Sequence, residues 1–262
     1  GLILTKNLLF SCVILFGVYL FCFVIYDLRY HMAVERFRDV SDGRDRSGWF
    51  GNMFREGLPL FVNAFLIMAI LNEPKMVIDT AIAQGEMSAG IQTVFNILFM
   101  PASVLNLAYI VFRPMITQMA IVWNRGENRR FLKILGKIIG YLLAISIVLM
   151  IGSALLGIPV LSIVYAVDLS AYKSELLVIM VGGCVYTFAA VLDNALVVLR
   201  RQYVLVIAYA LTWIYIKLTA AWLVGEWAVM GASLAYCTAM AVYLLLTAVL
   251  FVSGYRRKSG EV

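Results

Sequence analysis

Long apolar stretches alternate with short polar gaps along this 262-residue chain, and basic residues collect in every second gap. Each of seven stretches is close to the ~20 apolar residues that a helix needs to cross a bilayer. Of the 21 Lys and Arg residues, 16 fall in four alternate gaps, at 27–56, 124–137, 200–202 and 255–262. Cytoplasmic loops retain Lys and Arg, whereas translocated loops do not. The pattern predicts an all-α, polytopic membrane protein of about seven transmembrane helices, with its N-terminus outside and its C-terminus cytoplasmic.

The composition excludes several other classes of protein. Hydrophobic residues make up 63% of the chain and charged residues 14%, against roughly 25% charged in soluble domains. Topology accounts for the net charge of +6, so we expect membrane lipids and no nucleic acid as partners. All four cysteines lie in the expected spans without CxxC spacing, and His31 is the single histidine. These residues cannot build a zinc site or a disulfide framework, and we expect neither metal nor cofactor.

Three segments are expected along the chain. Residues 1–26 hold a single transmembrane helix, and 27–56 form a cytoplasmic linker that ends in a short interfacial helix carrying Trp49. Residues 57–262 hold six further helices. Their expected spans are near 57–71, 88–123, 134–156, 174–196, 203–224 and 228–252.

The prolines predict where these helices start and bend. Pro59 is expected at a helix start, where its missing N–H is tolerated. Pro74 predicts a kink or a break near the outer surface, and Pro101 and Pro114 predict bends in the 88–123 span. Small residues recur at four-residue spacing, which favours close helix packing; they are Gly136 and Gly140, and Gly231, Ala235 and Ala239.

Charged residues inside a span are costly and usually face a cavity or a partner. Arg113 lies ten residues before Trp123, ~15 Å from the inner end at helical rise. Two interpretations stand: contact with an anion in a water-filled lumen, or snorkelling and ion pairing. Lys217 reaches the outer interface by snorkelling or contacts substrate. Asp79 is expected at the outer rim, and Asp193 near the inner interface in a local ion pair.

Three asparagines complete the predicted binding residues. Asn63 lies on the second span, and Asn96 and Asn106 lie on the third. Arg113 follows Asn106 by seven residues, which places both on nearly the same face of a continuous helix. They line a substrate surface or, alternatively, form interhelical hydrogen bonds.

The sequence gives no support for an enzyme. No carboxylate pair, nucleophile–base constellation or glycine-rich phosphate loop is present. The expected outer loops are too short for a luminal catalytic domain. Transport and a structural role are the function classes that remain.

Four segments within residues 57–130 carry a resemblance to a known family. They are Gly57-Leu58-Pro59-Leu60, Asn72-Glu73-Pro74-Lys75 through Asp79, Phe95-Asn96 to Pro101, and Phe112-Arg113-Pro114 into Trp123-Asn124. This region resembles the polysaccharide (O-antigen-type) flippases of the multidrug/oligosaccharidyl-lipid/polysaccharide exporter superfamily. Later segments are similar too, so the resemblance extends over about 50–255, and each motif is a diffuse apolar pattern.

The resemblance implies the C-terminal six-helix bundle of a MATE-like transporter plus the preceding helix, in a bacterial cytoplasmic (inner) membrane. The missing partner is an N-terminal bundle of the same protein. The implied substrate is a polyprenyl-pyrophosphate-linked oligosaccharide for surface polysaccharide biosynthesis. The alternatives are a cation-coupled multidrug exporter of the same fold and a non-catalytic membrane assembly subunit. Mid-span cations with peripheral carboxylates favour an anionic substrate over cation coupling.

Overall fold

The computed structural model describes residues 8–27, 29 and 46–259, and it describes side chains at 13–26, 29, 57–105 and 109–256. The described chain is helical and contains no strand, as the apolar stretches predict. It divides into two units, Gly1–Met53 and Phe54–Val262. Most of the expected linker lies outside the described residues.

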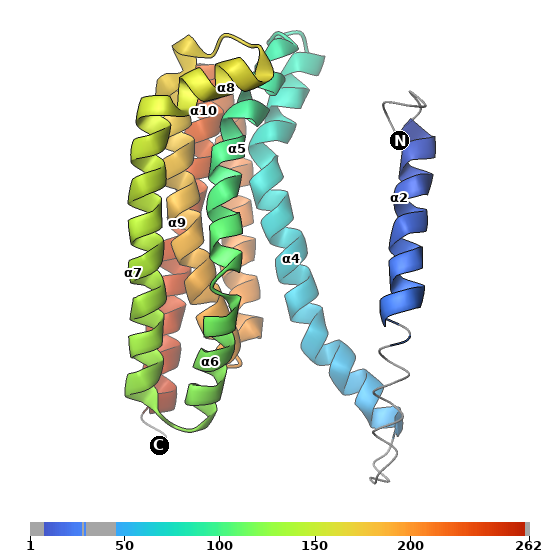
Figure 1. Cartoon of the computed structure of the whole chain (residues 1–262), viewed down its shortest axis with the longest axis vertical. Helices are drawn as coiled ribbons and strands as arrows, with labels where there is room; N and C mark the ends of the chain where they lie inside the picture. Colours follow the sequence, from blue (N-terminus) through green and yellow to red (C-terminus); the bar gives the residue numbers. More distant parts are fainter. Residues whose placement is uncertain (1–7, 28, 30–45, 260–262) are drawn as a thin grey trace. The chain divides into compact units, whose positions relative to one another are not determined.

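The described part of the first unit is one apolar helix. α2 spans Leu8–Cys22 and continues as a π-helical turn, η1, over Phe23–Asp27 (Figure 1). The side chains from Val13 to Tyr26 are exposed around the whole helix. A helix that is apolar on every side suits a lipid environment.

The helix α4 spans Arg46–Ala83 and passes through Pro59 and Pro74 without interruption. The prediction that Pro59 marks a helix start is therefore wrong, because the preceding segment, with Trp49, is already helical. The helix is also not broken at Pro74. Its buried residues recur mostly every three or four positions, which is the spacing of one helix face; they are Pro59, Asn63, Ile67, Ile70, Glu73, Pro74, Ile78 and Ala81.

The expected third span is two helices. α5 covers Gly90–Ile110 and contains Pro101, and α6 covers Arg113–Asn124. Pro114, in the first turn of α6, has no N–H and its ring would clash with the carbonyl four residues earlier, that of Ile110. The chain therefore stops one helix and starts another, where the sequence predicted a bend. The break also removes the shared helical register on which the common face of Asn106 and Arg113 depended.

Five further elements follow. α7 spans Asn128–Gly152 and continues through the π-turn η2 (Ser153–Gly157) into α8 (Ile158–Tyr165). α8 lies across the end of the bundle (Figure 1). After the 3₁₀ turn η3 (Ser170–Tyr172), α9 spans Lys173–Val198.

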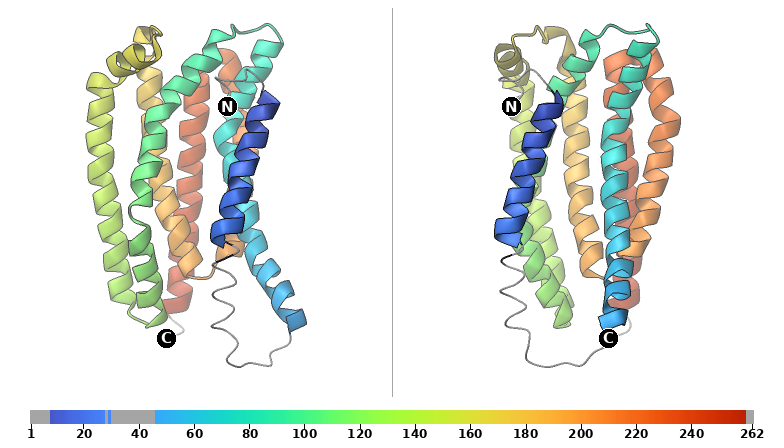
Figure 2. Two further views of the ribbon diagram at one scale, coloured as in Figure 1. Left: turned by 45° about the vertical axis from the view of Figure 1, so that its right-hand side comes forward. Right: turned by 90° about the vertical axis from the view of Figure 1, so that its right-hand side faces the viewer.

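The long element α10, Gln202–Ser259, is a helical hairpin, because Ala228 has non-helical dihedrals (φ 46°, ψ −119°). Its two arms lie side by side in Figure 2. Tyr209 stacks on Tyr243 with ring centroids 4.8 Å apart, and a side chain at Gly231 would overlap the Leu223 carbonyl group. Each pair joins residues on opposite sides of Ala228, as antiparallel arms require. The turn falls at the boundary predicted between the last two spans.

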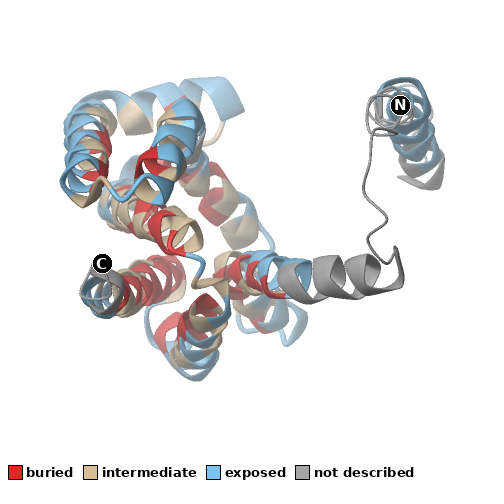
Figure 3. Ribbon diagram, turned by 90° about the horizontal axis from the view of Figure 1, so that it is seen from below, coloured by how far each residue is buried: buried red, intermediate tan, exposed pale blue. Residues whose placement is uncertain are grey.

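The core is built around α9, which packs against α5, α6, α7 and both arms of α10. Two glycines of α9 allow the closest approaches. A side chain at Gly182 would lie 3.1 Å from the Cα of Cys237 on α10, and one at Gly183 would lie 3.1 Å from the Cβ of Ala102 on α5. Buried residues face the centre of the bundle and exposed ones face outward (Figure 3).

Four helical stretches in the described part are long and apolar enough to cross a membrane: Gly57–Ala83, Asn128–Tyr165, Ser170–Val198 and Gln202–Arg256. Shorter apolar helices cover Val13–Tyr26 and Gly90–Leu105. This length and apolar character are compatible with insertion into a membrane.

Candidate functional site

An ion pair joins α4 to the first arm of α10. Glu73 Oε1 lies 2.8 Å from Lys217 Nζ, and the side chains are 6% and 44% exposed, respectively. The carboxylate is buried because Glu73 adjoins the inward face marked by Ile70 and Pro74. The ammonium is half exposed. It has three N–H donors, so donors remain for a second acceptor on its exposed side.

A second charged side chain of α4, that of Lys75, makes a contact two residues further on. Lys75 Nζ lies 4.7 Å from the centre of the Phe99 ring on α5. Phe99 in turn meets Tyr236 of the second α10 arm edge-on, at 4.9 Å, and Tyr236 covers Gly182 of α9. Glu73, Lys75, Phe99 and Lys217 are called the α4 clamp below. The α4 clamp links one helix to two others through a carboxylate and two ammonium groups.

A separate polar group lies between α9 and α10, towards the connection between these helices. The Tyr209 hydroxyl donates a 2.7 Å hydrogen bond to Asp193 Oδ2, and Tyr243 stacks on the Tyr209 ring. One turn earlier on α9, the Ala190 carbonyl accepts hydrogen bonds from Asn194 Nδ2 at 2.8 Å and from the Tyr109 hydroxyl at 3.4 Å. In transporters, carboxylates inside a helix bundle bind protons and small cations.

Arg113 is the first residue of α6 and is exposed. It lies ~15 Å from Trp123 at helical rise, and Trp123 packs against Phe131 and Tyr255 in an aromatic cluster typical of a membrane interface. No ion pair with Arg113 occurs among the described residues.

The predicted binding residues do not form one surface. Lys217 pairs with Glu73. Asn63 is buried, and its Nδ2 donates to the Gln202 carbonyl at 3.4 Å. Asp79 is exposed on α4, and Asn96 is half buried on α5. Asn106 lies on α5, but its side chain is outside those described.

Two carboxylates, Glu73 and Asp193, have partners inside the bundle that the sequence did not predict. Glu73 is 4% exposed in a continuous helix, although the expected break at Pro74 placed it at the outer surface. Asp193 is held by a phenol inside the helix bundle, and no ion pair to it occurs among the described residues. Both carboxylates therefore have partners within the bundle, and their position near the ends of the spans stays a prediction. The buried-face spacing of α4 is the sequence signal that identifies Glu73, whereas its pairing with Lys217 has no local signal.

Neither the described side chains nor the comparisons with known proteins assign a metal or a family to the chain. No group of three His, Cys, Asp or Glu side chains in the described part of the chain is placed to hold a metal ion. No family model, curated protein or solved structure matches the chain. The case for a function therefore rests on the residues themselves.

Proposed function

We propose that the chain forms part of a membrane transporter that moves a polyprenyl-pyrophosphate-linked oligosaccharide across the bacterial cytoplasmic membrane. In this proposal α2 is one crossing, and the remaining helices form a six-helix bundle whose C-terminus is cytoplasmic. α5 with α6 supplies one crossing and the two arms of α10 supply one each. A second, N-terminal bundle of the same protein completes the transport path, and no enzymatic step is required.

The observation that carries the proposal is the exposed Arg113 at a helix break, far from either expected membrane surface. Non-helical backbone at membrane depth is tolerated where it is covered by protein or lines a water-filled cavity. A guanidinium presents a planar fork of donors that matches the oxygens of a phosphate. An exposed arginine without an acidic partner in the described residues suits a transient anionic ligand better than a structural ion pair.

The mechanism follows from this placement. Arg113 binds the diphosphate, and the polyprenyl chain stays in the bilayer. Movement of the two bundles against each other opens the path to one side of the membrane and then to the other. The substrate carries its own negative charge past the midplane only while Arg113 offsets it, because an unpaired charge in the membrane is costly.

Asp193 supports a second candidate, a cation-coupled exporter of the same fold. Inside the bundle, the Asp193 carboxylate accepts a hydrogen bond from the Tyr209 hydroxyl, 2.7 Å away. Carboxylates in such positions bind protons or ions in transporters. The two candidates differ in which residue is indispensable. The flippase requires Arg113 for its cargo, whereas a cation-coupled drug exporter requires Asp193 and has no need of Arg113.

The test is complementation of surface-polysaccharide export by the native protein in a deletion strain. We expect Arg113→Ala to abolish export at unchanged membrane abundance and Arg113→Lys to retain part of it. Arg130→Ala is the matched control, because Arg130 is an exposed arginine already paired with Glu127. Full export by Arg113→Ala would contradict the proposal. Loss of drug resistance with Asp193→Asn, and not with Arg113→Ala, would favour the exporter.

A further inference from the structure

Pro74 puts a flexible point in the middle of the α4 contacts. Proline has no backbone N–H, so the Ile70 carbonyl lacks its usual helical partner. The residues on either side of it, Glu73 and Lys75, make the two directional contacts of this region. The hinge and the α4 clamp therefore coincide.

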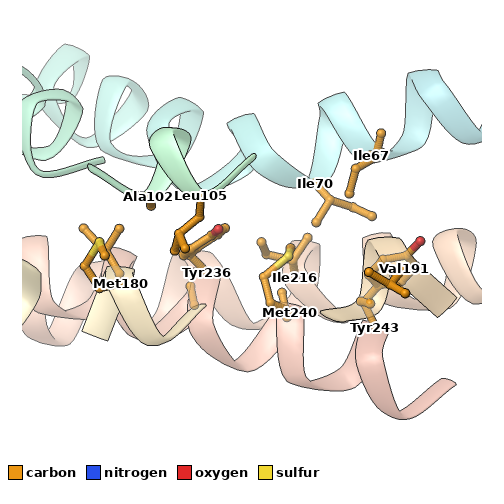
Figure 4. Close-up of a cluster of buried hydrophobic side chains, with 14 of the residues drawn as sticks. Ile67, Ile70, Ala102, Leu105, Met180, Val191, Ile216, Tyr236, Met240 and Tyr243 are labelled. Atoms are coloured by element: carbon orange, nitrogen blue, oxygen red, sulfur yellow. The ribbon is translucent and has the colours of Figure 1, made fainter. Parts of the chain in front are cut away.

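Apolar side chains hold the rest of α4 against the bundle. Ile67 and Ile70 point from α4 towards Ile216, Met240 and Val191 in Figure 4. Beyond the hinge, Ile78 and Ala81 are buried, while Asp79, Thr80 and Ala83 are exposed. Apolar contacts of this kind can slide, whereas an ion pair and a cation–π contact hold only in one arrangement.

The two clamp contacts restrain different neighbours. Lys217 belongs to the first arm of α10, and Phe99 belongs to α5 and contacts Tyr236 of the second arm. Separation of Glu73 from Lys217 leaves a carboxylate unpaired in an apolar site, which is strongly unfavourable unless water reaches it. Two arrangements result: a dry, paired state and an open, hydrated state.

We propose that the α4 clamp is a latch that holds residues 76–83 of α4 against the bundle, and that its opening lets this segment swing about Pro74. The latch is independent of which molecule is transported. In a transporter, it controls access to the bundle from the side between α4 and α10.

The test measures distances between spin labels at Ala83 on α4 and Leu218 on α10, both exposed, in the full-length protein without its native cysteines. We expect one narrow distribution for the parent protein. Glu73→Gln should raise an open state from below ~10% of molecules to a resolved population at longer distance. The exchanged pair Glu73→Lys with Lys217→Glu should restore the narrow distribution.

Asp79→Asn is the matched control, because it neutralises an exposed carboxylate on the same helix, and it should leave the distribution unchanged. Pro74→Ala added to Glu73→Gln should suppress the open population by stiffening the hinge. A single, unchanged distribution in Glu73→Gln would overturn the latch. Where Glu73→Gln does not yield folded protein, Lys75→Met decides: the open population supports the latch, and an unchanged distribution overturns it.

Discussion

At the residue scale, the cost of burying charge determines what the polar side chains do. Glu73 is almost fully buried and is paired with Lys217 at 2.8 Å, whereas Arg113 is exposed and has no ion pair among the described residues. Separation of a buried charge from its partner is costly, whereas an exposed charge exchanges partners readily. Glu73 therefore acts on the packing of the protein's own helices, and Arg113 is the better candidate for contact with substrate.

Removal of one partner of the ion pair should be worse than removal of both. Lys217→Met leaves the buried Glu73 carboxylate unpaired and should lower the free energy of unfolding by about 2 kcal/mol, less than for a fully buried pair because Lys217 is half exposed. Adding Glu73→Gln should recover most of the loss. Unfolding in detergent micelles measures both, with Lys137→Met as the exposed-lysine control. Equal stability of Lys217→Met and the parent would contradict this reading.

At the element scale, the sequence predicted most helices and their approximate ends but not how they are joined. The lengths of the apolar stretches placed the boundary near Ala228, because each stretch is close to the length that crosses a bilayer. The uninterrupted α4 and the broken α5–α6 were not foreseen, since Pro59, Pro74 and Pro114 are locally similar and packing determines which of them the helix tolerates. The pairing of Glu73 with Lys217 depends on the same long-range packing.

Glycines that look equivalent in the sequence differ in how closely other atoms pack against them. Gly182 approaches Tyr236 and the Cys237 backbone, whereas nothing lies within 4 Å of a side chain at Gly136 or Gly140. Gly182→Ala should therefore cost about 1–3 kcal/mol through overpacking. Gly136→Ala should leave the unfolding free energy unchanged or slightly higher, since alanine favours a helix. Comparable losses for the two variants would refute the packing at Gly182.

At the scale of the whole molecule, the relative direction of α4 and the first arm of α10 constrains the membrane topology. Two contacts, Asn63 with Gln202 and Glu73 with Lys217, run in the same order along α4 and the first arm of α10, so these helices are parallel. Parallel helices in a membrane bundle start on the same side. The basic residues near both starts predict that this side is cytoplasmic.

Cysteine labelling tests this topology. In a cysteine-free background, Asp168→Cys should react with a membrane-impermeant maleimide in intact cells, because it lies in the expected outer connection before α9. Asn124→Cys, at the end of α6, should react only after permeabilisation. Both positions are exposed, so accessibility within the protein is matched. Labelling of both from the same side would rule out the proposed crossings between them.

The most direct test of the central claim is movement of the substrate itself. The native protein is reconstituted into vesicles that carry a polyprenyl-diphosphate oligosaccharide in both leaflets, and an impermeant glycosidase reports how much of it reaches the outer leaflet. We expect digestion of nearly all the saccharide with the parent protein and an unchanged rate with Arg130→Ala. With Arg113→Ala the rate should be at least about tenfold lower, equivalent to ~1.4 kcal/mol. Digestion that stops at the outer-leaflet fraction, as in protein-free vesicles, would contradict the central claim.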